Sequence, residues 1–156
     1  MGKLIKATIC EIIRDGEILL QYKAAGKFGA GKWNGPGGKI MPNETPLEGV
    51  IREVREETGL KIINPQLNGL IDFYFGEKPE PDWSTFIFRV THYQGELKPN
   101  DEGMLKWFRV EEISYENMWQ DDVYWLPAFI EGKKVEGTFW FNEEGTRLIR
   151  HKINIF

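Results

Sequence analysis

The sequence predicts an α+β fold with a mixed β-sheet. Apolar segments of strand length outnumber helical ones, and the two clear helical segments do not alternate regularly with strands. The length of 156 residues is typical of one domain, so residues 1–156 are expected to fold together. With 41% hydrophobic and 28% charged residues, the chain has the composition of a globular protein with its own core.

The first expected element is a β-hairpin followed by a glycine-rich loop. Residues 3–13 and 17–23 have the apolar pattern of strands, and the Asp-Gly pair at 15–16 is a turn sequence that joins antiparallel strands. Residues 24–38 are rich in glycine and predict a loop with at most a short extended piece.

The strongest local signal predicts a helix over residues 46–58. Thr45 is a good N-cap, Pro46 suits the first helical position, and Glu48 completes a capping box with Thr45. Gly59 is expected to end the helix. The expected apolar stripe consists of Leu47, Val50, Ile51 and Val54.

The remainder of the chain predicts more strands than helices. Strands are expected over residues 67–75, 84–93 and 104–110, and over a closing hairpin of 135–142 and 146–155. A short helix is expected over 111–117 and a longer one over 121–132.

Charge and cysteine content exclude several classes of protein. A net charge of −4 argues against a basic face that binds polymeric nucleic acid. The only cysteine, Cys10, excludes an intramolecular disulfide and a cysteine-rich zinc site. His92 and His151 are too isolated to suggest a metal site. No segment has the length of a membrane span or the apolar run of a signal peptide, so we expect a cytoplasmic protein.

The predicted helix concentrates negative charge on one patch. Glu53, Glu56 and Glu57 are three and four residues apart, so their carboxylates are neighbours on the helix surface and repel one another. A solvated acidic face is one interpretation. A hard divalent cation such as Mg²⁺, which prefers oxygen ligands, is the other. The turn over residues 35–38 favours the second, because glycines let backbone carbonyls approach an ion closely.

The residues around this helix match a known motif at every fixed position. The pattern is G-x5-E-x7-R-E-U-x-E-E-x-G-U, where U is aliphatic, and it spans residues 38–60. The matching residues are Gly38, Glu44, Arg52, Glu53, Glu56, Glu57 and Gly59, with Val54 and Leu60 at the aliphatic positions. This segment resembles the Nudix box, and the chain is similar to Nudix hydrolases.

The resemblance implies an αβα sandwich with a mixed sheet and a catalytic loop–helix–loop. It also implies Mg²⁺-dependent hydrolysis of a nucleoside diphosphate linked to another group, with Mn²⁺ as a substitute ion. By this resemblance the metal ligands are Glu53, Glu56 and Glu57, with a backbone carbonyl of Gly37 or Gly38. Arg52 would orient a glutamate, and which glutamate takes the proton of the attacking water stays open.

Flanking segments resemble the MutT-type subgroup, which acts on oxidised purine nucleotides. These segments are residues 28–35, 118–122, 124–125 and 133–134, together with Gly137. The resemblance implies that Thr8, Lys23, Phe28, Phe73 and Phe141 contact substrate and that Glu102 is a further metal ligand. This chain departs from the subgroup at an added Lys27, at Gln120 in place of proline and at Pro36 in place of phenylalanine, so the shape of the pocket is open.

Side-chain chemistry adds an expected base pocket. Asn34 carries a donor and an acceptor suited to a purine edge, and Trp119 offers a ring for stacking. If Asp121 and Asp122 are buried together, one carboxyl keeps its proton, so the pair presents both a donor and an acceptor. The alternatives are that Trp119, Phe73 and Phe141 are core residues and that the aspartates cap the following helix.

The expected function is hydrolysis of oxidised purine nucleoside triphosphates, such as 8-oxo-dGTP or 2-hydroxy-dATP, to the monophosphate and pyrophosphate. The expected enzyme is a monomer whose partner is a small nucleotide, with no polymeric nucleic acid and no membrane. One rival is a Nudix pyrophosphatase for an unmodified or methylated dNTP or a sugar nucleotide. The other is a non-catalytic nucleotide- or RNA-binding regulator, which would need a broken glutamate set or a basic face that this sequence lacks.

Overall fold

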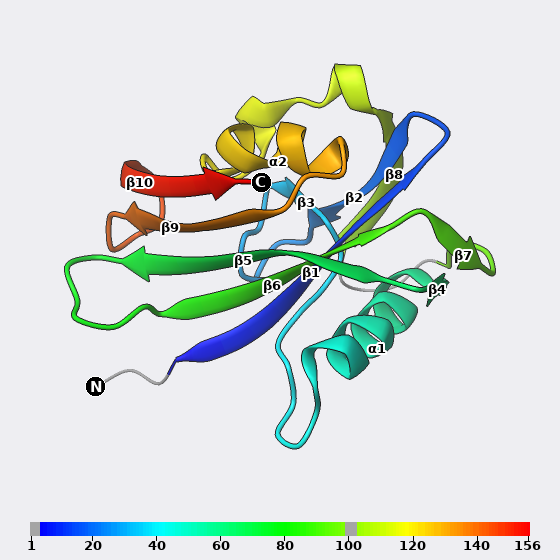
Figure 1. Cartoon of the computed structure of the whole chain (residues 1–156), viewed down its shortest axis with the longest axis horizontal. Coiled ribbons are helices and arrows are strands. Elements are labelled where there is room, and N and C mark those ends of the chain that lie inside the picture. The colour runs from blue at the N-terminus through cyan, green and yellow to red at the C-terminus, as the bar shows by residue number, and fades with distance from the viewer. Residues whose placement is uncertain (1–3, 99–102) are drawn as a thin grey trace.

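A mixed sheet with one α-helix on each side organises the molecule (Figure 1). The computed structural model describes residues 4–98 and 103–156. The strand order is β10-β9-β5-β6-β1-β2-β3, and β8 pairs with β2. The strands are β1 (Ile5–Arg14), β2 (Glu17–Lys23), β3 (Trp33–Asn34), β5 (Gln66–Phe75), β6 (Trp83–Val90), β8 (Gly103–Arg109), β9 (Val135–Phe141) and β10 (Leu148–Ile155). The pairs β1–β6 and β5–β9 are parallel and the others antiparallel, which confirms the predicted mixed sheet.

The predicted hairpin is confirmed and joins β1 to β2. Arg14 of β1 pairs with Glu17 of β2, so the turn contains only Asp15 and Gly16. Both turn residues have positive φ, 54° and 77°, which is the conformation that suits a tight hairpin.

The helix α1 (Pro46–Thr58) has the predicted bounds. The Thr45 side chain accepts from the Glu48 N–H, the Glu48 carboxylate accepts from the Thr45 N–H, and Gly59 ends the helix with φ of 83°. The apolar stripe is narrower than predicted: Val50 and Val54 are fully buried. Leu47 and Ile51 face solvent, because the sheet covers only one side of this helix.

Short elements account for the main differences from prediction. The expected strand over 84–93 ends with β6, and β7 (His92–Gln94) then pairs with β4 (Lys61–Ile63) in a separate two-stranded sheet. Residues 111–117 form two 3₁₀ turns, Val110–Glu112 and Tyr115–Asn117, in place of one helix. The second helix, α2, is Asp122–Ile130.

Two apolar cores lie on opposite faces of the sheet. On the α2 side, Trp125 and Phe129 pack with residues of β1, β5, β6 and β9. On the α1 side, Val50 and Val54 pack with Cys10, which is buried as a small apolar side chain. Within the part of the chain that the structure describes, no helix is long and apolar enough to cross a lipid bilayer.

Replacing Thr45 with alanine tests the N-cap of α1. Loss of the hydroxyl acceptor leaves the Glu48 N–H without its partner, so the free energy of unfolding should fall by about 1 kcal/mol. Urea titration measures this change. Thr45→Ser keeps the hydroxyl and is expected to stay close to the parent; equal losses in both variants would contradict the capping role.

Candidate active site

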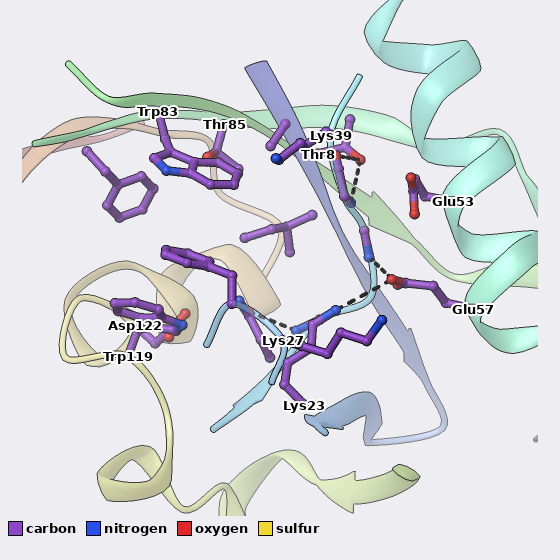
Figure 2. Close-up of a pocket in the computed structure, with 18 of the residues that line it drawn as sticks. Thr8, Lys23, Lys27, Lys39, Glu53, Glu57, Trp83, Thr85, Trp119 and Asp122 are labelled. Carbon is purple, nitrogen blue, oxygen red and sulfur yellow. Dashed lines mark hydrogen bonds and ion pairs between the residues drawn. The ribbon is translucent and has the colours of Figure 1, made fainter. Parts of the chain in front are cut away.

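One cavity of about 440 Å³ runs between α1, the sheet and the start of α2. Its two ends differ in chemistry. Figure 2 shows Glu53 and Glu57 at one end and Trp83, Trp119 and Asp122 at the other. Most of the predicted substrate and metal residues line this cavity, namely Thr8, Lys23, Phe28, Asn34, Gly37, Gly38, Glu53, Glu56, Glu57, Phe73, Trp119, Asp121 and Asp122.

The glycine segment of residues 35–38 forms the floor between the two ends. It runs beside β1 like an extra strand, because the Cys10 N–H donates to the Pro36 carbonyl at 2.7 Å and the Thr8 N–H donates to the Gly38 carbonyl at 2.8 Å. A Cβ on Gly37 would overlap the Thr8 carbonyl. Glycine is therefore required for this close approach.

Glu57 connects α1 to the glycine segment. Its Oε1 accepts from the Gly37 N–H at 2.9 Å, and its Oε2 lies 3.4 Å from Lys23 Nζ. The side chain is buried. These contacts hold α1 against the glycine segment and place the Lys23 ammonium beside the Glu57 carboxylate.

Arg52 holds the remaining carboxylates in one network. Its guanidinium donates to both oxygens of Glu44 at 2.7 and 3.0 Å and to Glu53 at 2.9 Å, and it lies 3.3 Å from Glu56. It also donates to the Lys39 carbonyl. The hydrogen bonds from Arg52, followed by one from the Met41 N–H, lower the pKa of Glu44 to about 2, and the same ion pairs raise the pKa of Arg52.

The carboxylate end has the donor set of a hard divalent cation. Glu53, Glu56 and Glu57 all line the cavity, and the Gly38 backbone lies directly against the Glu53 carboxylate, since a Cβ there would be 2.7 Å from its Cδ. The Gly38 carbonyl accepts from both the N–H and the hydroxyl of Thr8.

Protein contacts occupy these carboxylates in the structure. Arg52 holds Glu53 and Glu56, while Gly37 and Lys23 hold Glu57. Accordingly, the described residues contain no group of three or more His, Cys, Asp or Glu side chains already arranged around one metal position. The predicted ligand Glu102 lies outside the described residues.

Asp121 and Asp122 are buried together at the other end, 3% and 2% exposed. Asp121 occupies the N-cap position of α2, as the capping alternative expected, but its side chain accepts from the Trp125 indole N–H at 2.8 Å and makes no cap hydrogen bond. Burial raises the pKa of Asp121 to about 6. Burial and the charge on Asp121 raise the pKa of Asp122 well above its ordinary value. At neutral pH the pair therefore holds an ionised acceptor and a neutral donor.

Aromatic rings form the walls around this pair. Phe28 is stacked between Trp83 and Trp119, with ring centroids 5.0 and 5.4 Å apart. Trp119 therefore lines the cavity and is not a plain core residue. The placement of Phe141 differs from the prediction: it does not reach the cavity, because it is buried behind Trp119 and packs against its ring.

Several cavity residues were not predicted. Phe75 and Trp83 line the aromatic end, where the Lys39 ammonium lies over the Trp83 ring, and Lys27 lines the space toward the carboxylates (Figure 2). Phe75 shares a strand face with Phe73 by its spacing of two, a signal present in the sequence. The role of Trp83 depends on pairing between β5 and β6, which places it opposite Phe73 and which no local pattern reveals.

Asn34 is oriented by its neighbour. Its side-chain oxygen accepts from the Gly35 N–H at 2.9 Å, so its amide NH₂ is the group left to face a ligand. Thr8 is buried, and its hydroxyl donates to the Gly38 carbonyl at 3.3 Å, which ties β1 to the cavity floor.

The mixed sheet between two helices, with a glutamate-rich helix facing the cavity, is the αβα sandwich that the sequence predicted (Figure 1). The comparisons with known proteins give its family. The NUDIX domain matches residues 3–129. The chain therefore belongs to the Nudix hydrolase family and is an enzyme.

Individual relatives agree with this assignment. The chain is 37% identical over 148 residues to the oxidized purine nucleoside triphosphate hydrolase of Danio rerio, covering 94% of this chain and 92% of that protein. The protein of the same name from Mus musculus is 36% identical, covering 90% and 89%. The crystal structure of the MutT protein from Bacillus halodurans superposes with a TM-score of 0.86 at 28% identity, covering 96% and 97%.

Replacing Glu44 with glutamine tests the network around Arg52. Because folding lowers the pKa of Glu44 from 4.5 to about 2, its ion pair stabilises the parent above pH 4.5, and this contribution is lost as pH falls toward 2. The gap in Tm between parent and Glu44→Gln should therefore be widest near neutrality and close in acid. Thermal unfolding from pH 2 to 7 measures it, with the exposed Glu80→Gln as control; a gap independent of pH would contradict the assignment.

Proposed function

We propose that this enzyme hydrolyses purine nucleoside triphosphates with an oxidised base, of the 8-oxo-dGTP or 2-hydroxy-dATP type, to the monophosphate and pyrophosphate. Its role would be to remove damaged nucleotides from the pool. The observation that carries the proposal is one cavity with a carboxylate wall at one end and a buried pair of aspartates among aromatic rings at the other. The names of the Danio rerio and Mus musculus relatives support the substrate class.

The buried aspartates suit the edge of an oxidised purine. Oxidation of guanine at C8 turns N7 from an acceptor into an N–H donor. An ionised Asp121 can accept such a hydrogen bond, while a neutral Asp122 and the NH₂ of Asn34 can donate. Trp119, Trp83 and Phe28 supply flat faces for the ring.

The other end suits the phosphate chain. Lys23 and Lys27 line the cavity on the glutamate side, where their charges can position the triphosphate, and the Lys39 ammonium lies over the Trp83 ring, 6.0 Å from its centroid (Figure 2). Mg²⁺ would be held by Glu53, Glu56, Glu57 and a backbone carbonyl of Gly37 or Gly38, and when bound it supplies charge neutralisation and a lowered pKa for the attacking water. One of these glutamates takes the proton of that water as the phosphoanhydride bond breaks and pyrophosphate leaves.

We infer a cytoplasmic monomer that acts on free nucleotides, with Mn²⁺ able to replace Mg²⁺. A negative net charge of −4 fits a small-nucleotide substrate better than polymeric nucleic acid, because the phosphates would be held through the metal and a few lysines.

A substrate panel tests the proposal directly. With Mg²⁺ present, kcat/KM for 8-oxo-dGTP or 2-hydroxy-dATP should exceed that for dGTP and dATP by about 10- to 100-fold, the value of one or two hydrogen bonds to a charged group. Pyrophosphate release measures the rate. A methylated dNTP and a UDP-sugar extend the panel to the rival substrates. Equal kcat/KM for oxidised and normal purines would overturn the oxidised-base proposal.

Replacing the helix carboxylates tests the reaction centre. Glu53→Gln and Glu56→Gln each remove a ligand charge, so kcat should fall by about 10²-fold or more while the fold is kept. Glu80→Gln, at an exposed loop position away from the cavity, is the control and should keep the parent rate. Unchanged turnover in both helix variants would show that the reaction centre lies elsewhere.

A further inference from the structure

Glu11 is a buried carboxyl that the proposed reaction does not yet use. It lies on β1 two residues after Ile9 and two residues before Ile13, and both isoleucines pack into the core on the α2 side. Glu11 therefore projects toward the same side of the sheet as α2. It is 0% exposed, and neither carboxyl oxygen has a hydrogen-bond partner among the described residues.

The carboxyl lies directly behind the wall of the cavity. A Cβ on Gly35 would overlap Glu11 Oε1, so the Gly35 backbone is in contact with this oxygen. Gly35 and its neighbour Asn34 both line the cavity. The backbone of Gly35 therefore separates Glu11 from the aromatic end of the cavity, where Asp121 and Asp122 lie.

The groups that face Glu11 are mainly acidic. Burial, and then the negative charge of Asp121, raise the pKa of Glu11 to about 8. The phenol of Tyr115 faces the same cluster: burial, followed by the charges of Asp122 and Glu11, raises its pKa to about 12. Cys10, its neighbour in the chain, stays a neutral thiol because burial raises its pKa.

The guanidinium of Arg89, on the neighbouring strand β6, does not pair with Glu11. Arg89 of β6 is the register partner of Glu11 in β1, but its guanidinium donates to the Ile130 carbonyl at the far end of α2. Among the described residues no ion pair joins the two side chains. A buried carboxyl without a cation or a hydrogen-bond donor is neutral at pH 7, because the charged form would lose its hydration without compensation.

We propose that Glu11 is a positioning residue for base recognition, the third member of a buried carboxyl cluster that it forms with Asp121 and Asp122 through the wall at Gly35. This role of Glu11 rests on the proposed function in one respect, namely that Asp121 and Asp122 hydrogen-bond the purine base. At neutral pH the cluster carries one negative charge, on Asp121, and two protons, on Glu11 and Asp122. Glu11 acts through Asp122: once Glu11 ionises, its charge makes loss of the Asp122 proton harder, so the donor to the base persists to higher pH.

The pH profile of kcat/KM tests this role in Glu11→Gln, which keeps the shape of the side chain, and in Glu11→Met, which makes the position apolar. In both variants the alkaline limb for 8-oxo-dGTP should move to lower pH by about one unit, with the acid limb unchanged. Glu136→Gln removes one charge from an exposed position of β9 and should leave both limbs in place. Alkaline limbs that coincide in parent and variants would overturn the proposal.

Thermal unfolding gives a second readout that needs no substrate. The pKa of Glu11 is about 8 in the folded chain against an ordinary value of 4.5, so its contribution to stability is present below pH 4.5 and is lost as pH rises to 8. The Tm of Glu11→Gln relative to the parent should therefore rise from pH 5 to 8. A difference independent of pH would show that Glu11 is not a neutral acid of this cluster.

The two proposals fail in distinguishable ways. If 8-oxo-dGTP is no better a substrate than dGTP, the proposed function fails, and the alkaline limb is then measured with whichever purine nucleotide the parent hydrolyses. A shifted limb with that nucleotide still supports Glu11 as the residue that sets the protonation of the aspartates. An unshifted limb overturns the role of Glu11 whatever the substrate.

Discussion

The backbone hydrogen bonds between β1 and the glycine segment are the constraint on which both ends of the cavity depend. Cys10 and Thr8 donate to the carbonyls of Pro36 and Gly38, which fixes the segment against the sheet. The N–H of Gly37 then donates to the carboxylate of Glu57 on α1. One stretch of main chain therefore holds both α1, through Glu57, and the cavity wall at Gly35 against the sheet.

The parts of the fold that sequence predicts are those encoded by neighbours in the chain. The bounds of α1 follow from Thr45, Glu48 and Gly59, which interact within one turn of the helix. The exposure of Leu47 could not be predicted, because it depends on how much of the helix the sheet covers. Strand β4 is only three residues long and exists through its pairing with β7, so it leaves no periodic pattern.

The candidate site divides in the same way. The glutamates of α1 are visible in sequence because a helix brings residues three and four apart together. Trp83 and Glu11 are brought to the base end by strand pairing and packing, and Phe141 is separated from it by Trp119. The carboxyl pKa values differ in direction between the two ends: hydrogen bonds from Arg52 lower the pKa of Glu44, whereas burial raises the pKa values of Glu11 and Asp122.

The position of Phe28 has a consequence for the thermodynamics of ligand entry. Its ring already fills the space between Trp83 and Trp119, although the residue is 61% exposed. An incoming base would exchange one ring contact for another instead of covering bare apolar surface. The net gain from stacking is therefore small, and discrimination between bases falls to the few hydrogen bonds at the purine edge.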